Sequence, residues 1–233
     1  MRRFVVFFSI VLLATGSASA QHPRLGIKAG LNASTYTGAE LPHSDYRFGG
    51  AAGLLLQRPL LQHLGLQSEL LYEQRGSELK YTNSTEGVTF TTIDYIRTVR
   101  SRLHYGSLAV LLRPRQGTWF AVAGPQFSYL LAEKRTIQDQ VNVIVGPVDP
   151  VLPDGSARIV RNKQEYNRGE VGYVVGIGRE VGTHWQVEGR YAAGFTKLRQ
   201  PTVAVDAVYG SERVQHARSQ SLQVQISYLL SSQ

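Results

Sequence analysis

Hydrophobic and polar residues alternate along the last segment of this chain. The apolar positions are Leu222, Val224, Ile226, Tyr228 and Leu230, and the polar positions between them are Gln223, Gln225 and Ser227. Because successive side chains of a β-strand point to opposite sides, this pattern predicts a strand with one apolar and one polar face. In a transmembrane β-barrel the apolar face contacts lipid and the polar face lines the interior.

Similar alternation predicts seven further strands. They cover residues 25–34, 46–57, 64–75, 100–113, 119–131, 169–180 and 185–196. In the first, placing Lys28 against lipid near the bilayer centre would cost roughly 2–4 kcal/mol, so its polar face is predicted to line the interior. The segment 100–113 carries apolar residues on both faces, so its orientation stays open.

The predicted connections alternate between short and long. Short ones lie near residues 58–63, 114–118 and 181–184, and long ones near 35–45, 76–99, 132–168 and 197–218. Outer-membrane barrels have short periplasmic turns and longer extracellular loops. The sequence therefore predicts an all-β fold, an eight-stranded antiparallel up-and-down transmembrane β-barrel with long extracellular loops and periplasmic termini.

Two details of these connections are also predicted. Pro59 is expected to end the second strand, because proline cannot donate to the hydrogen-bond ladder. Within the longest loop, residues 141–145 and 157–160 flank a segment rich in proline and glycine and are expected to form a protruding hairpin.

Aromatic residues fall at the predicted ends of the strands, where barrels carry girdles at the lipid–water interfaces. Trp119 and Trp185 each follow a short turn, and Tyr228 lies at the same level. Tyr72, Tyr129 and Phe195 are expected at the opposite end. These residues favour a membrane barrel over a soluble fold with scattered aromatics.

The first twenty residues have the features of a secretory signal peptide. Arg2 and Arg3 precede an apolar run over 4–13, and Ala18-Ser19-Ala20 resembles a cleavage site. The run is shorter than the roughly 18–20 residues that a membrane helix needs. We therefore predict a signal peptide at 1–20, a barrel domain at 21–233, and export to the bacterial outer membrane.

Composition narrows the candidate chemistry. The chain has no cysteine, which excludes disulfides and thiolate metal sites. Its formal net charge of +8 is not gathered in a lysine or arginine run, so a nucleic-acid partner is not expected. The spacing of the six histidines predicts no metal site, and no glycine-rich loop opens a helix, so no cofactor is expected.

Several charged residues are predicted to point into the barrel. They are Lys28, Arg47, Glu69, Glu73, Glu188 and Arg190. The interior of an eight-stranded barrel is just wide enough for side chains to fill it, and isolated buried charges are costly. The charges are thus expected to pair and plug the barrel. A path for ions or protons is the alternative.

Motifs along the whole chain resemble those of one family. They are Gly26-Ile27-Lys28-Ala29-Gly30-Leu31-Asn32, Leu66-Gln67-Ser68-Glu69-Leu70-Leu71-Tyr72, Ala123-Gly124-Pro125-Gln126-Phe127-Ser128-Tyr129-Leu130-Leu131, Gly176-Ile177-Gly178 and Arg190-Tyr191. In order and spacing the chain resembles the PorT-like outer-membrane β-barrels of Bacteroidetes-type bacteria. The resemblance implies an eight-stranded barrel and, through one branch, a link to protein secretion. It supplies no catalytic residues, and Arg75 stands where a lysine is more usual.

The leading hypothesis is a non-enzymatic barrel that binds envelope or secretion proteins through its outer loops and contacts outer-membrane lipid. One alternative is an enzyme acting on lipid or peptide at the barrel rim. His104, Ser107 and Glu69 are its only grouping to inspect, although His104 and Ser107 should face different sides. The other alternative is a soluble periplasmic barrel that binds a ligand inside.

Overall fold

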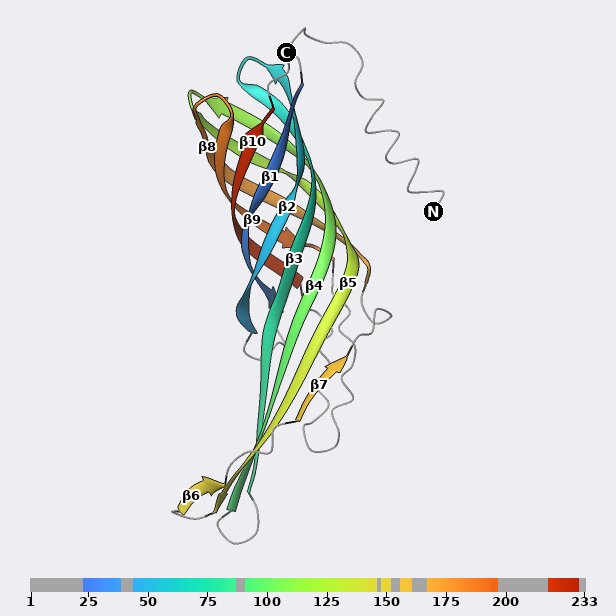
Figure 1. The fold of residues 1–233 in the computed structure, drawn as a ribbon, viewed down its shortest axis with the longest axis vertical. Helices are drawn as coiled ribbons and strands as arrows, with labels where there is room; N and C mark the ends of the chain where they lie inside the picture. Colours follow the sequence, from blue (N-terminus) through green and yellow to red (C-terminus); the bar gives the residue numbers. More distant parts are fainter. Residues whose placement is uncertain are drawn as a thin grey trace.

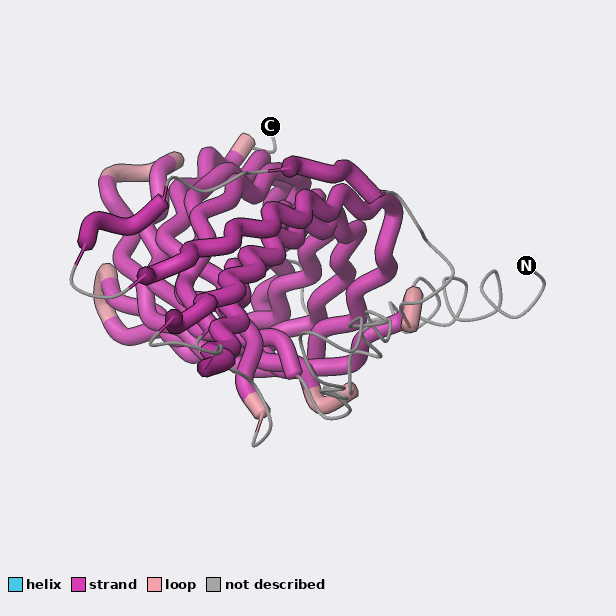
Figure 2. Tube along the Cα trace, turned by 90° about the horizontal axis from the view of Figure 1, so that it is seen from below, coloured by secondary structure: helices cyan, strands magenta, loops and turns pink. Residues whose placement is uncertain are grey.

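A computed structural model describes residues 23–38, 44–86, 91–145, 148–151, 156–160, 167–196 and 218–230. The predicted signal peptide lies outside these residues. The described residues form strands joined by short loops (Figure 2). The strands are β1 (Arg24–Thr37), β2 (Ser44–Leu61), β3 (Leu64–Glu86), β4 (Thr91–Gln116), β5 (Trp119–Val145), β6 (Val148–Val151), β7 (Ser156–Val160), β8 (Gly169–Val181), β9 (Trp185–Gly194) and β10 (Arg218–Leu229).

Eight of the strands close into a ring. Neighbours pair antiparallel in the order β4-β3-β2-β1-β10-β9-β8-β5, and β4 also pairs with β5. The first and last strands meet over twelve register pairs, from Gly26↔Leu229 to Thr37↔Arg218. The predicted eight-stranded antiparallel barrel is confirmed (Figure 1). Within the described residues, no helix has the length and hydropathy needed to cross a bilayer.

Short turns join the strands at one end of the ring. Gly117 and Gly182 adopt φ angles of 61° and 68°, a left-handed conformation that glycine tolerates best. The β2–β3 turn differs from the prediction, because β2 runs through Pro59 to Leu61. Pro59 lies opposite Gly65, and a register shift follows it, so an irregularity in the ladder accommodates the proline.

The opposite end of the barrel carries long strands where the sequence suggested loops. The region 76–99 was expected to be a loop, but β3 continues to Glu86 and β4 begins at Thr91. Their register is unbroken from Leu64↔Pro114 to Glu86↔Thr92. β5 likewise extends to Val145. The two expected arms of the hairpin do not pair with each other, because Val143 and Val145 pair with β6, whereas β7 pairs with β5 farther back, from Arg135 to Asp139. Figure 1 shows β3, β4 and β5 projecting far beyond the rest of the ring.

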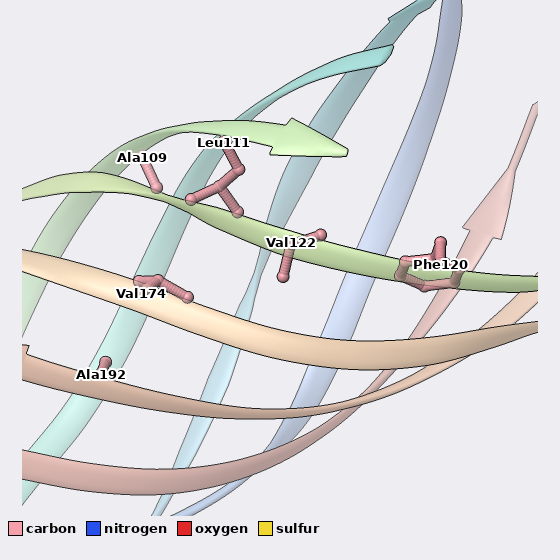
Figure 3. Packing of buried hydrophobic residues seen from close by; sticks show 6 residues of the cluster. All are labelled: Ala109, Leu111, Phe120, Val122, Val174 and Ala192. Atoms are coloured by element: carbon pink, nitrogen blue, oxygen red, sulfur yellow. The ribbon is translucent and has the colours of Figure 1, made fainter. Parts of the chain in front are cut away.

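Part of the barrel interior is an apolar core. It consists of Ala109, Leu111, Phe120, Val122, Val174 and Ala192, from β4, β5, β8 and β9 (Figure 3). This core settles the orientation of β4, whose two faces are both apolar. Leu111 is fully buried inside the barrel, whereas its neighbour Leu112 is half exposed on the outer surface, where lipid lies in a membrane barrel.

Candidate functional site

The rest of the interior is occupied by a network of buried ion pairs centred on Glu69. One Glu69 oxygen accepts hydrogen bonds from Lys28 Nζ at 2.7 Å and Gln67 Nε2 at 2.6 Å. The other accepts one from Arg190 at 2.5 Å. Lys28 also donates to Glu188 at 2.8 Å. Alternation along β1, β3 and β9 directs these side chains inward, and the ring brings them together.

A second group of ion pairs lies beside the first and is centred on Arg75. Arg75 donates to Glu73 at 2.5 Å and to Glu170 at 2.9 Å. Glu73 also accepts from Ser107 at 2.6 Å and Gln126 at 2.9 Å. Arg190 Nη2 lies 3.9 Å from Glu73 and connects the two groups. Four carboxylates and three cations therefore form one connected network inside the barrel.

Amide side chains extend this network. Gln223 of β10 donates to Glu73 at 3.0 Å and accepts from Arg190 at 2.8 Å. Gln57 donates to Gln67 at 2.8 Å and to Gln186 at 2.9 Å. The alternation of the last strand predicts its polar face but not its partners. The structure shows that this face contributes to the network through Gln223.

These ion pairs can block the barrel interior and keep the strands that they join in register. Its charged side chains are at most 6% exposed, so little water reaches them. A buried charge is tolerated when partners satisfy it, and removing one partner is strongly destabilising. Within the described residues, no group of three or more acidic or histidine side chains is placed to hold a metal ion.

The structure places five of the six charges predicted for the interior, namely Lys28, Glu69, Glu73, Glu188 and Arg190, in this network. Arg47 is the exception. It is half-buried near the outer end of β2, where the charges that act on it include Arg102 and Glu78. Its neighbours Tyr46 and Phe48 are exposed, so Arg47 keeps the predicted inward parity but lies nearer the outer end of the barrel than the network does.

Sequence reasoning missed two members of the network. Arg75 has the same parity as Glu69 and Glu73, so the strand pattern places it inside, but it is the last residue of the predicted strand 64–75. Glu170 lies at the second position of β8, where too few residues precede it to establish an alternation.

The aromatic residues predicted as girdles lie at two levels. Trp119 and Trp185 are half exposed beside the short turns, and the rings of Trp185 and Tyr228 lie 4.9 Å apart. At the other level, Tyr72 and Tyr129 flank Gly106 in the register of β3, β4 and β5. Phe195 is 58% exposed and follows β9 at that end.

The grouping inspected for catalysis is not assembled. The Tyr72 hydroxyl and His104 Nδ1 form a hydrogen bond of 2.5 Å on the outer surface. Ser107 is buried and donates to Glu73 instead. His104 and Ser107 therefore face opposite sides of β4, as their parity requires.

The chain was compared with protein families, curated proteins and solved structures. The family model of the outer membrane protein beta-barrel domain matches residues 19–200. No curated protein matches the chain. Among solved structures, the attachment invasion locus protein Ail of Yersinia pestis, in complex with the heparin analogue sucrose octasulfate, is 9% identical with a TM-score of 0.42, over 90% of this chain and 100% of Ail.

Two further solved structures are similar at comparable levels. Neisserial surface protein A is 10% identical with a TM-score of 0.33, over 89% of this chain and 99% of its own. CarO of Acinetobacter baumannii is 14% identical with a TM-score of 0.38, over 86% of this chain and 97% of its own. Since the family model covers most of its length, this chain belongs to the outer membrane protein β-barrel domain family and is a protein of the bacterial outer membrane.

Proposed function

We propose that this protein is a non-enzymatic binding or scaffolding component of the bacterial envelope, and that its projecting strands are the contact surface. The observation that carries the proposal is the continuation of β3, β4 and β5 beyond the ring (Figure 1). Loops that only connect strands need no such length. A rigid sheet outside the membrane can present a fixed surface to another protein.

The edge of this projecting sheet supports the proposal. β2 reaches β3 no farther than Ser44↔Leu79, so in the described residues β3 pairs only with β4 from Lys80 to Glu86. The free edge of a strand offers unpaired N–H and C=O groups, onto which a partner can add a strand. The opposite edge of the sheet is β5, which is paired in part with β6 and β7.

The filled interior supports binding over transport. Charges at the centre of the barrel are already paired with one another, and an apolar core occupies the rest. We therefore expect very low conductance in a planar bilayer. This expectation separates the proposed role from that of an ion path.

The resemblance to PorT-like barrels suggests which partners to test. We propose an envelope or secretion protein as the occupant of the β3 edge, after export directed by a signal peptide at 1–20. Outer-membrane lipid surrounds the barrel itself.

The test removes the projection and keeps the ring. In one variant, residues 80–97 and 138–162 are each replaced by Asn-Gly, because trimming β5 alone would leave the outer part of β4 without its neighbour. A control variant lacks residues 201–212, which follow β9 in the sequence. All three proteins are expected to reach the outer membrane and to migrate differently before and after heating.

Cross-linking in intact cells followed by mass spectrometry is the measurement. The parent and the control should share a cross-linked envelope protein that the trimmed variant lacks. If the partner adds a strand to the free edge of β3, it should also cross-link to residues 80–86. The proposal is refuted if all three proteins cross-link to the same partners and all three show the same low conductance in planar bilayers. The projection would then act only as a spacer.

A further inference from the structure

Four arginines surround a cavity at the turn end of the barrel. The cavity has a volume of about 280 Å³ and lies between the start of β1, the β2–β3 turn and the end of β4. Its lining includes Arg24, Arg58, Arg113 and Arg115, together with His63, but no carboxylate. We call it the turn-end arginine pocket.

Arg113 is the built-in part of this pocket. Its side chain is only 7% exposed and lies over the ring of Phe120, 4.0 Å from the ring centroid. One of its terminal nitrogens donates to Glu180 at 2.7 Å, which fixes the guanidinium. Its Nε has no hydrogen-bond partner among the described residues. A buried donor without an acceptor is unfavourable, so Arg113 would gain from an acceptor brought within reach of its Nε.

The other arginines add charge that the protein does not neutralise. Arg24 donates to the carbonyl oxygen of Thr183 at 2.6 Å, which is a neutral acceptor. The side chains of Arg58 and Arg115 form no ion pair with a described residue. The backbone of Arg115 donates to the carbonyl of His63 at 2.8 Å and holds the turn beside β4. Arg24, Arg58 and Arg115 therefore line one cavity with Arg113, and Glu180, which pairs with Arg113, is not part of the lining.

We propose that the turn-end arginine pocket binds a phosphate group. The guanidinium fork matches phosphate oxygens in geometry, and such charge-assisted pairs are stronger than neutral hydrogen bonds. Short turns of these barrels lie on the periplasmic side, at the level of the inner-leaflet headgroups. The phosphate can thus belong to a phospholipid headgroup or to a soluble phosphate compound. The site is at the opposite end from the projecting strands and does not depend on the function proposed for them.

The test uses the full chain purified in dodecyl maltoside, which contains no phosphate. Titration with inorganic pyrophosphate, followed by calorimetry, reports a soluble ligand. Native mass spectrometry with phosphatidylglycerol, and with diacylglycerol as the lipid lacking phosphate, reports a headgroup. The double variant Arg58→Gln/Arg115→Gln removes two charges that form no ion pair with a described residue. The control Arg179→Gln removes one charge at the same end of the barrel but outside the lining.

We expect the parent and the control to bind one phosphate probe equally, and the double variant to bind it about tenfold or more weakly. Preference for phosphatidylglycerol over diacylglycerol identifies a headgroup, and binding of pyrophosphate identifies a soluble ligand. Arg113→Lys, which keeps the charge but loses the fork, should also weaken binding if the protein retains its heat-modifiable migration. The proposal fails if the parent binds neither probe, if the double variant binds as the parent does, or if Arg179→Gln loses as much as the double variant.

Discussion

The two sides of the barrel interior solve the same packing problem in different ways. On the side of β1, β3, β9 and β10, ion pairs and amides fill the space. On the side of β4, β5 and β8, an apolar core fills it nearer the turns, whereas Ser107, Gln126 and Glu170 of the same strands join the ion pairs nearer the projection. At the level of this core the boundary runs between β3 and β4, where Glu69 pairs in register with Ala109, and Gln67 with Leu111. The comparison teaches that the interior of a small barrel must be filled by side chains, and that either polar or apolar side chains can fill it.

The two sides should respond differently to the loss of one side chain. In the polar side a deletion leaves opposite charges without partners, because the remaining groups stay buried. In the apolar side it leaves a cavity that neighbours close only in part. Unfolding by urea in lipid vesicles can measure both losses.

The largest effect is expected for Glu69→Gln. Glu69 is the shared partner of Lys28 and Arg190, so its neutralisation leaves two buried cations with one fewer acid. We predict a loss of about 3–5 kcal/mol in the free energy of unfolding. The double variant Lys28→Met/Glu69→Gln should lose less than the sum of the two single variants, because it removes a charge together with its partner. Additive losses would contradict the pairing.

The second prediction concerns the apolar side. Leu111→Ala should cost about 2–4 kcal/mol, since a fully buried leucine is lost and a cavity remains. Its neighbour Leu112 is the matched control, because it is 51% exposed on the outer surface. Leu112→Ala should cost less, as lipid chains refill the space. Equal losses in the two variants would mean that the apolar core is not tightly packed.

How far the sequence predicted this comparison depends on the strand. On β1, β9 and β10 the alternation was clean, because one face contacts lipid and the other faces polar groups. On β4 the same reasoning left the orientation open, because an apolar interior and a lipid exterior demand the same residue types. The partners of Glu69 could not be derived either, since parity gives the facing of a side chain but not the register between strands.

The polar segment 76–99 shows a second limit of the sequence pattern. Inside a membrane, one face of each strand must be apolar, and this requirement produces the alternation. The outer parts of β3 and β4 lie beyond the barrel, where water can contact both faces, so a paired strand can be polar throughout. Polarity over the whole segment therefore does not distinguish a loop from the paired strands that the structure shows.

A third prediction sharpens the distinction within the polar side. Glu188 shares Lys28 with Glu69, and its Oε1 forms no hydrogen bond with a described residue. Glu188→Gln should therefore cost about 1–3 kcal/mol, less than Glu69→Gln, because Lys28 keeps one carboxylate. The same urea titration compares the two variants directly. An unchanged free energy of unfolding would remove Glu188 from the set of stabilising residues, and a loss equal to that of Glu69→Gln would show that the two acids act as one unit.

The smallest effect is expected where an ion pair of the same chemistry lies in water. Arg100 donates to Glu78 at 2.9 and 3.3 Å across β3 and β4, where the projection leaves the ring, and its side chain is 45% exposed. These hydrogen bonds and the attraction of the carboxylate raise the pKa of Arg100. Exposed pairs nevertheless contribute only about 0.2–1 kcal/mol, because water and salt screen them.

Arg100→Ala should therefore change the free energy of unfolding by less than about 1 kcal/mol, and the difference from the parent should shrink between 50 mM and 1 M salt, roughly as Debye screening requires. Glu78→Gln should show the same small, salt-sensitive loss, whereas the loss in Glu69→Gln should persist at high salt. A large loss in Arg100→Ala that ignores salt would mean that the base of the projection is as dry as the barrel interior. The difference between the two ion pairs would then reflect their partners and not their exposure to water.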